Sequence, residues 1–367
     1  MQSSIYERII QFMMISMFVF CFLVLIRTKL ILHRSVIACV IWIIYSLIVN
    51  ISNFSNSPFS LFFVVTQSLW WPVAFIVFFY FNKNAGIFDF FIKKYSLFLF
   101  IVTFFICIYL IFLFSGNYDL TKGVVVQDQI NSIYWPLFLI PLVINSNNKR
   151  ISYLLPLLIL IIFSTKRAPL IAIVMISINI ALFYIIKLNL KSIILLILSG
   201  AIFFGSIIKI TENVELNATD RILETEVENE PRFIFILDSY ERYIAKDITK
   251  KIFGSGYRST AIDRGGILSK TTHNDFLEII YSYGIFGFII FLWVLLRITP
   301  SFSQISQLNK KEKVLLYNSF ILFLMISLVS HLTLYPSYFL TILFIWSGIN
   351  AKSQNFTLNS YRSQIGQ

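Results

Sequence analysis

Long apolar runs recur along almost the whole chain, and they constrain its fold more than any other feature. A helix needs about 20 apolar residues to cross the roughly 30 Å hydrocarbon core of a bilayer. Runs near this length occur at 9–26, 35–51, 58–81, 95–115, 131–144, 151–164, 168–186, 192–208, 274–296, 314–333 and 336–350. Only 13% of the residues are charged, about half the share typical of soluble proteins. We therefore predict an all-α, polytopic integral membrane protein with about 11 transmembrane helices, and exclude a water-soluble enzyme.

The runs 131–144 and 151–164 are shorter than the others and contain prolines. Proline frees backbone groups that the membrane tolerates only where they face protein or water. These two spans are therefore expected to be tilted, broken or partly re-entrant.

The charged residues indicate how the chain is oriented in the membrane. Outside 209–272, most Lys and Arg residues fall in alternate short loops, as at 27–34, 83–94 and 297–313, and such loops face the cytoplasm. Thirteen of the 18 acidic residues lie between Glu212 and Glu278. The net charge of +12 is thus a topology signal, and no nucleic-acid partner is expected. We predict that the N-terminus and the segment 209–272 lie outside and the C-terminus lies inside.

The predicted organisation has four parts: helices 1–8 in 1–208, an external loop domain at 209–272, helices 9–11 in 273–350 and a cytoplasmic tail at 351–367. From Arg232 to Phe253 the external segment has apolar residues at helical spacing, which predicts an amphipathic helix. Its apolar face is expected either to lie on the outer membrane surface or to cap the bundle. Gly254-Ser255-Gly256-Tyr257-Arg258 closes this helix.

Three motifs resemble those of the O-antigen polymerase and O-antigen ligase superfamily, the Wzy-type polymerases and their ligase relatives. Ser164-Thr165-Lys166-Arg167-Ala168-Pro169 begins a span on the external side. Arg232 opens the amphipathic helix that precedes Gly254-Ser255-Gly256. His273-Asn274-Asp275-Phe276-Leu277-Glu278 continues through Tyr283-Gly284-Ile285-Phe286-Gly287 into a span. The resemblance is close over roughly 160–296, and elsewhere it extends only to hydropathy.

The resemblance implies an enzyme that transfers lipid-linked oligosaccharide in the bacterial cytoplasmic (inner) membrane. Of the two activities in the superfamily we expect a polymerase of repeat units, which makes O-antigen or capsular polysaccharide. The resemblance further implies a metal-independent, inverting glycosyltransferase without a cofactor. Its donor is a glycan on undecaprenyl pyrophosphate, and its other partners are membrane lipids and a chain-length regulator protein. An O-antigen ligase, which transfers the finished glycan to lipid A-core, shares these features. A flippase for the same lipids would show repeated halves and no sizeable external domain.

The chemistry of this transfer assigns roles to the motif residues. Arginine holds phosphate oxygens with a planar, permanently charged fork, which suits Arg167 and Arg232. Histidine has a pKa close to working pH and serves as a base, which suits His273. The resemblance thus implies His273, Arg167 and Arg232 as catalytic residues. Arg167, His273 and His331 come from three spans and all fall at their external ends, so they share one level.

Further substrate contacts are expected from Arg242, Tyr257, Arg258, Asn274, Asp275, Glu278 and His331. Each has a structural alternative that the sequence leaves open. Thr272 is a possible N-cap of the following helix, Arg242 is spaced for an ion pair with Asp238, and the two acids are possible solvated helix-start residues. The glycines 254 and 256 suit either a helix C-cap or a loop that approaches phosphate. No metal-ligand cluster or nucleotide-binding loop is evident.

Overall fold

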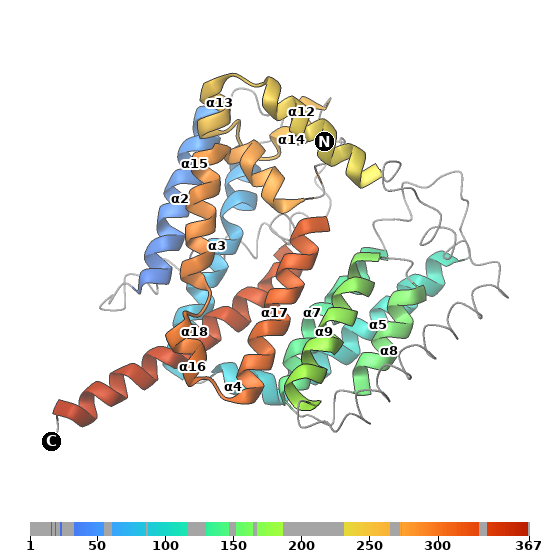
Figure 1. Ribbon diagram of the computed structural model, residues 1–367, viewed down its shortest axis with the longest axis vertical. Helices are drawn as coiled ribbons and strands as arrows, with labels where there is room; N and C mark the ends of the chain where they lie inside the picture. The colour runs from blue at the N-terminus through green and yellow to red at the C-terminus, as the bar shows by residue number, and fades with distance from the viewer. Residues whose placement is uncertain are drawn as a thin grey trace.

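The computed structural model describes residues 33–54, 61–85, 87–115, 130–146, 152–163, 167–185, 231–264, 272, 274–329 and 336–365, with the single positions 16, 19 and 23. All regular structure in these ranges is helical (Figure 1). The helices are α2 (Arg34–Ser52), α3 (Leu61–Ala85), α4 (Ile87–Lys94), α5 (Ser96–Ser115), η3 (Ile130–Ile133), α7 (Tyr134–Ser146), α8 (Leu154–Phe163), α9 (Arg167–Ile185), α12 (Pro231–Ala245), α13 (Ile248–Phe253), α14 (Ser259–Asp263), α15 (Asp275–Ile298), α16 (Phe302–Gln307), α17 (Lys310–Val329) and α18 (Pro336–Ile365).

The predicted all-α fold is confirmed over the described residues, and several of their helices are candidate membrane spans. Among the described residues, Arg34–Ser52, Leu61–Lys83 and Asp275–Gln307 are long and apolar enough to cross a membrane. The bent pair Ile87–Lys94 and Ser96–Leu110, with an angle of 49°, makes a fourth candidate if it forms one span. The runs 9–26 and 192–208 lie outside the described residues, apart from the three single positions. The number of about 11 spans therefore stays a prediction.

The two proline-containing runs form short helices over their described residues, and their tilt, break or re-entry stays a prediction. α7 has 13 residues and α8 has 10, which at 1.5 Å per residue is roughly 20 and 15 Å. Neither is long enough to cross a 30 Å hydrocarbon core as a straight helix. Pro141 lies inside α7.

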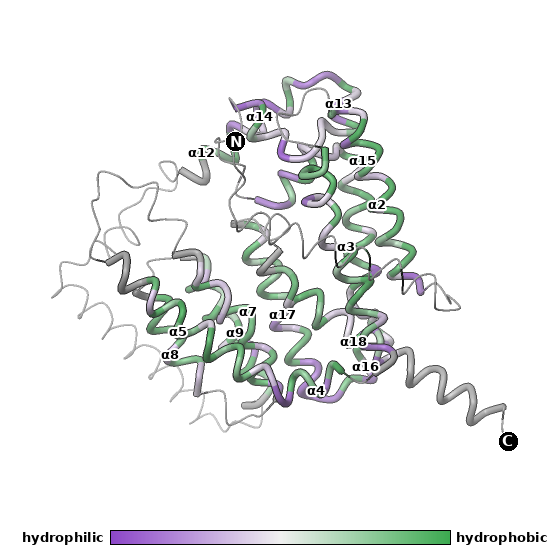
Figure 2. Tube along the Cα trace, turned by 180° about the vertical axis from the view of Figure 1, so that it is seen from behind, coloured by the Kyte–Doolittle hydropathy of each residue, from purple (hydrophilic) through white to green (hydrophobic). Residues whose placement is uncertain are grey.

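α3 and α18 pack along each other at the centre of the bundle, where a buried hydrogen bond of 3.2 Å joins Asn82 Nδ2 to Ser347 Oγ. α2 packs against both α3 and α15, and α17 packs between α9 and α18 (Figure 1). Aromatic rings fill the junction of α2, α3 and α15, with Trp42 centred 5.7 Å from Trp71 and 5.5 Å from Phe291. Many large apolar side chains of these helices are exposed, among them Ile44, Ile48 and Ile289, and Figure 2 shows that hydrophobic residues predominate along the helices.

The two ends of the bundle differ in what they carry. One end holds α12, α13 and α14 with the start of α15, and the other holds α4, α16 and the start of α17 (Figure 1). At the second end Lys352 pairs with Asp89 at 3.1 Å and with Glu312 at 2.7 Å, and Arg34 donates to Ser301 Oγ at 3.5 Å. Segments predicted to be cytoplasmic are thus grouped opposite the segment predicted to be external.

Three helices depart from the expected boundaries. The amphipathic helix predicted over 232–253 is two helices, because Asp247 caps the start of α13 with its side chain and so ends α12 before it. α15 is kinked at Gly284, where φ is 71° and ψ is 177°. α18 continues through the predicted boundary between span and tail at 350 and ends at Ile365.

Candidate active site at the capped end of the bundle

Residues 231–264 fold into a cap, made of α12, α13 and α14, over the first half of α15 (Figure 1). Arg264 fixes α12 in place, with its Nε 2.6 Å from Asp238 Oδ2 and with further bonds to Ser239 Oγ and the Phe235 carbonyl. Burial raises the pKa of Asp238, but hydrogen bonds from Arg264 and Arg242 outweigh it, and the net pKa is lower than usual. One side of α12 thus packs over α15 through polar contacts. On its other side Ile234, Leu237 and Ile244 remain exposed.

The cap is joined to α15 by direct contact of two backbones. α13 ends at Gly254, with φ of 93°, and the N–H groups of Ser255 and Gly256 donate to the Ser282 carbonyl at 3.0 and 2.8 Å. The N–H of Gly254 donates to Lys250, and that of Tyr257 donates to Asn50 Oδ1 at 2.8 Å. Since all four amides have acceptors within the protein, this turn is a helix C-cap and not a phosphate-binding loop.

The two acidic residues at the start of α15 are buried, with exposed fractions of 1% for Asp275 and 3% for Glu278. Glu278 accepts hydrogen bonds from Thr260 Oγ1 at 2.6 Å and from Ser282 Oγ at 3.1 Å. The alternative of solvated helix-start acids is therefore wrong. Glu278 instead links α14 of the cap to the first turns of α15.

Asn274 is the N-cap of α15, because its Oδ1 accepts the N–H of Leu277 at 2.9 Å. The expectation that Thr272 is the N-cap is wrong. Asn274 itself has extended backbone angles, and the Thr272 hydroxyl bonds to the Asn274 carbonyl at 2.8 Å. Asn274 Nδ2 also donates to the Leu328 carbonyl of α17 at 3.0 Å. His273 lies outside the described residues, but both of its neighbours lie at this junction of α15, α17 and the cap.

α9 begins at Arg167, as predicted from the first motif, although the Arg167 side chain is outside the described part. α9 runs antiparallel to α17, with Asn179 bonded to Asn318 at 2.6 Å and Phe183 next to Tyr317. From this contact the start of α9 lies roughly 18 Å away and Leu328 roughly 15 Å away in the same direction. The start of α9 therefore lies at the level where Leu328 meets Asn274. His331, also outside the described residues, follows the end of α17 by two positions.

Of the two arginines of α12, the structure describes the side chain of Arg242 and not that of Arg232. Arg232 is the second residue of the helix, and its side chain is outside the described part. Arg242 pairs with Asp238 at 2.7 Å and donates to the Asp263 carbonyl at 3.0 Å. The ion pair foreseen from the spacing is thus present, and it directs Arg242 toward the body of the cap.

Tyr257, Arg258 and Glu278, three of the predicted substrate contacts, line one small cavity of about 30 Å³. This volume holds about one water molecule, so a pyrophosphate does not fit in the cavity as it stands. Tyr257 is 6% exposed and its ring meets Phe63 edge-on at 6.3 Å. Arg258 has left-handed backbone angles, φ 54° and ψ 28°, which are uncommon for residues other than glycine and are often seen at functional sites.

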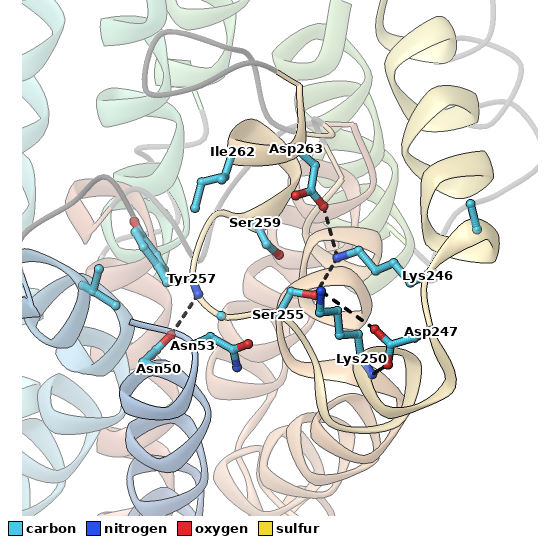
Figure 3. Close-up of a pocket in the computed structure, with 13 residues that line it drawn as sticks. Asn50, Asn53, Lys246, Asp247, Lys250, Ser255, Tyr257, Ser259, Ile262 and Asp263 are labelled. Carbon is cyan, nitrogen blue, oxygen red and sulfur yellow. Dashed lines mark hydrogen bonds and ion pairs between the residues drawn. The ribbon is translucent and has the colours of Figure 1, made fainter. Parts of the chain in front are cut away.

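A larger cavity of about 430 Å³ lies on the other side of Tyr257, between the end of α2 and the cap (Figure 3). Its polar side chains include Asn50, Lys246 and Asp263, none of which the sequence had indicated as site residues. Lys246 and Asp247 interrupt the helical spacing of apolar residues in 232–253, and this interruption was the available signal for a break at the site.

Lys246 is the most unusual group in this cavity. Its side chain is 9% exposed, and its Nζ lies 3.3 Å from Asp263 Oδ2, 2.7 Å from Ser255 Oγ and 3.4 Å from the centre of the Tyr281 ring. Asp263 also accepts a hydrogen bond of 2.6 Å from Tyr281 OH. Burial lowers the pKa of Lys246 to about 8, against the opposing effect of Asp263. This ammonium is held rigidly, and it loses its proton at a pH well below that of an exposed lysine.

Comparison with known proteins adds one finding. A family model described as O-antigen ligase matches residues 152–292, a range that includes α8, α9, the cap, the start of α15 and all three sequence motifs. No curated protein and no solved structure matches the chain. The family match agrees with the resemblance carried by the motifs, and it places the chain in the O-antigen ligase and polymerase superfamily.

Proposed function

We propose that this protein polymerises lipid-linked oligosaccharide repeat units of O-antigen or capsular polysaccharide on the external face of the bacterial inner membrane. The observation that carries the proposal is the meeting of the motifs at one end of the bundle. The start of α9, the end of α17 and the start of α15 reach one level, and the cap covers α15 there. A donor anchored by its lipid tail presents its pyrophosphate at such a membrane boundary.

In the proposed reaction, a hydroxyl oxygen of the acceptor repeat unit attacks the anomeric carbon of the growing glycan. A new carbon–oxygen glycosidic bond forms as the bond from that carbon to the pyrophosphate oxygen breaks. Undecaprenyl pyrophosphate leaves with the bonding electron pair, and the hydroxyl proton passes to a base. Attack from the side opposite the leaving group inverts the anomeric configuration.

The residues proposed for this reaction come from separate helices. His273 takes the proton, a role that general bases fill with a contribution of roughly 10²–10⁴ in rate. Arg167 and Arg232 hold the leaving pyrophosphate, because guanidinium groups bind phosphate oxygens bidentately. The helix start at Arg167 adds unpaired backbone N–H groups that favour an anion. Activation by pyrophosphate and neutralisation by arginine need no metal ion.

The second candidate is an O-antigen ligase, which the description of the matching family favours. It would use the same donor and the same leaving group, and only the acceptor would differ, since a ligase transfers the finished glycan to lipid A-core. The same residues would therefore serve a polymerase and a ligase. The two functions are distinguished by the polysaccharide products that accumulate in the cell.

The test is a gel of surface polysaccharide from a strain that lacks the gene, complemented with wild type, His273→Ala, Arg167→Ala or Arg297→Ala. Arg297 is the matched control, since it lies exposed at the opposite end of α15. If the protein is a polymerase, we expect the deletion strain to carry single repeat units on the acceptor. Wild type and Arg297→Ala should restore the ladder of longer chains, and His273→Ala and Arg167→Ala should not.

Other outcomes separate the alternatives. Long glycans that accumulate on undecaprenyl pyrophosphate in the deletion strain identify a ligase instead. A ladder that is unchanged by the deletion refutes both functions. A normal ladder from both His273→Ala and Arg167→Ala refutes the assigned roles and leaves the function intact.

A further inference from the structure

We propose that the cavity of about 430 Å³ between α2 and the cap binds an uncharged stretch of the oligosaccharide of the lipid-linked substrate, separately from the pyrophosphate. This inference rests on the proposed function and deepens it. The cavity is of the size that small-molecule sites usually have, about 300–1,000 Å³. The side chains of Lys250 and Asp263 are 50% and 41% exposed, so the site is accessible from outside.

The charges that line the cavity are balanced. Lys246 pairs with Asp263 at 3.3 Å, and Lys250 lies 3.8 Å from Asp247 (Figure 3). A site for pyrophosphate needs a surplus of cations, and this set of two lysines and two aspartates has none. The cavity therefore favours a polar ligand without net charge.

The lining groups match the hydroxyl groups of a saccharide, each of which both donates and accepts hydrogen bonds. Carboxylates accept, ammonium groups donate, and serine and asparagine side chains do both. The central groups are already in fixed positions, since Ser255 and Asp263 hold Lys246 and Tyr281 OH holds Asp263. Such groups lose little freedom when a ligand binds. Ile262 of α14 adds an apolar wall for the C–H groups of a sugar ring.

The cavity shares a wall with the catalytic end of α15. Tyr257 lines both this cavity and the small cavity next to Arg258 and Glu278. Ser259, from the large cavity, lies 3.4 Å from Ser282, whose hydroxyl donates to Glu278. Residues 257–260 alone therefore separate a saccharide in the cavity from the first turns of α15.

The binding test uses the purified protein in nanodiscs and, as probe, the repeat-unit oligosaccharide cut from the strain's own polysaccharide, without lipid or phosphate. Ile262→Trp places a bulkier side chain in the wall of the cavity. Ile248→Trp is the matched control, because Ile248 is 69% exposed on α13 and does not line the cavity. We expect wild type and Ile248→Trp to bind the probe alike and Ile262→Trp to bind it more than tenfold more weakly. Equal binding by Ile262→Trp, or no binding by wild type, overturns the proposal.

Lys250→Ala keeps the proposal testable if the tryptophan variant does not fold, since Lys250 is exposed and tolerates truncation. We expect about fivefold weaker binding, the usual effect of one lost hydrogen bond. Inorganic pyrophosphate should not displace the probe, and displacement would identify a phosphate site instead.

Transfer kinetics then identify which saccharide occupies the cavity. Ile262→Trp raises the KM for the acceptor repeat unit if the acceptor is bound, and the KM for the donor if the growing chain is bound. If both KM values are unchanged in Ile262→Trp, the saccharide site is refuted. The ladder made by wild type would still support the polymerase. Conversely, probe binding by a wild-type protein that restores no ladder refutes the function and leaves the saccharide site standing.

Discussion

Gly254 and Gly284 pack against each other backbone to backbone, and each has a positive φ, of 93° and 71°. A Cβ atom on Gly284 would lie 2.6 Å from the Gly254 nitrogen and would overlap the Ile252 carbonyl. A Cβ atom on Gly254 would overlap the Ser282 carbonyl and the Tyr283 backbone. The cap and the kink of α15 thus depend on two positions without side chains, one on each side of the contact.

Gly284→Ala and Gly254→Ala are predicted to detach the cap from α15. Both glycines combine a positive φ with a ψ near 180°, of 175° and 177°. Such a conformation is essentially restricted to glycine and costs another residue on the order of 1–3 kcal/mol, and the overlap with backbone adds to this cost. Gly256→Ala is the control, since its φ is 92° but its nearest contact is a side-chain atom at 3.3 Å, so it carries the strain without backbone overlap. Hydrogen exchange of 231–264 should increase strongly in the first two variants and less in the control. Equal protection in all three contradicts the prediction.

Glu278→Gln is predicted to destabilise the start of α15 by about 1–3 kcal/mol, the cost of leaving a buried polar group without its partner. The Gln amide has one oxygen acceptor in place of two, so it cannot accept from both Thr260 and Ser282 as Glu278 does. Glu241→Gln on the exposed face of α12 should leave the stability unchanged. Denaturant unfolding in detergent measures the difference, and a Glu278→Gln variant as stable as wild type contradicts the prediction.

Arg264→Lys is predicted to loosen α12, although it keeps the charge. Arg264 reaches Asp238, Ser239 and the Phe235 carbonyl from a side chain that is 8% exposed, and a lysine cannot reproduce that planar fork. Arg242→Lys is the comparison, because the Arg242 side chain is 46% exposed and exposed ion pairs contribute about 1 kcal/mol or less. Limited proteolysis of the cap should be faster only in Arg264→Lys.

Lys246 is predicted to make the stability of the cap vary with pH in the alkaline range. Its folded-state pKa of about 8 is below the ordinary 10.5, so between these values the unfolded chain binds the additional proton. Stability contributed by this group therefore rises with pH across that window and is constant below it. Between pH 7.5 and 10 the Tm of wild type should rise relative to Lys246→Met. Lys311→Met, at an exposed position at the start of α17, leaves Lys246 and its neighbours in place and should show the same rise as wild type. A Tm difference between wild type and Lys246→Met that stays constant over this pH range contradicts the prediction.

Local pattern determined much of this protein. The apolar runs predicted the helices that the structure describes in those ranges, the spacing of Asp238 and Arg242 predicted their ion pair, and the glycines after Phe253 predicted the end of a helix. The three motifs predicted the superfamily that the family match then showed. Each of these features depends on residues that are close in sequence or on a short motif, so one-dimensional spacing is sufficient to detect it.

Tertiary structure alone decided which groups share the capped end. Asn50 accepts the N–H of Tyr257, Glu278 accepts from Thr260, and Lys246 is buried between Asp263 and the Tyr281 ring. The first of these contacts joins residues more than two hundred positions apart, and no periodicity relates them. Their pairing depends on which helices pack together and at what height. By its sequence context Lys246 is one more polar residue of an amphipathic helix. It lines a cavity and pairs with Asp263 because α12 ends at Ala245 and the chain turns back over α15.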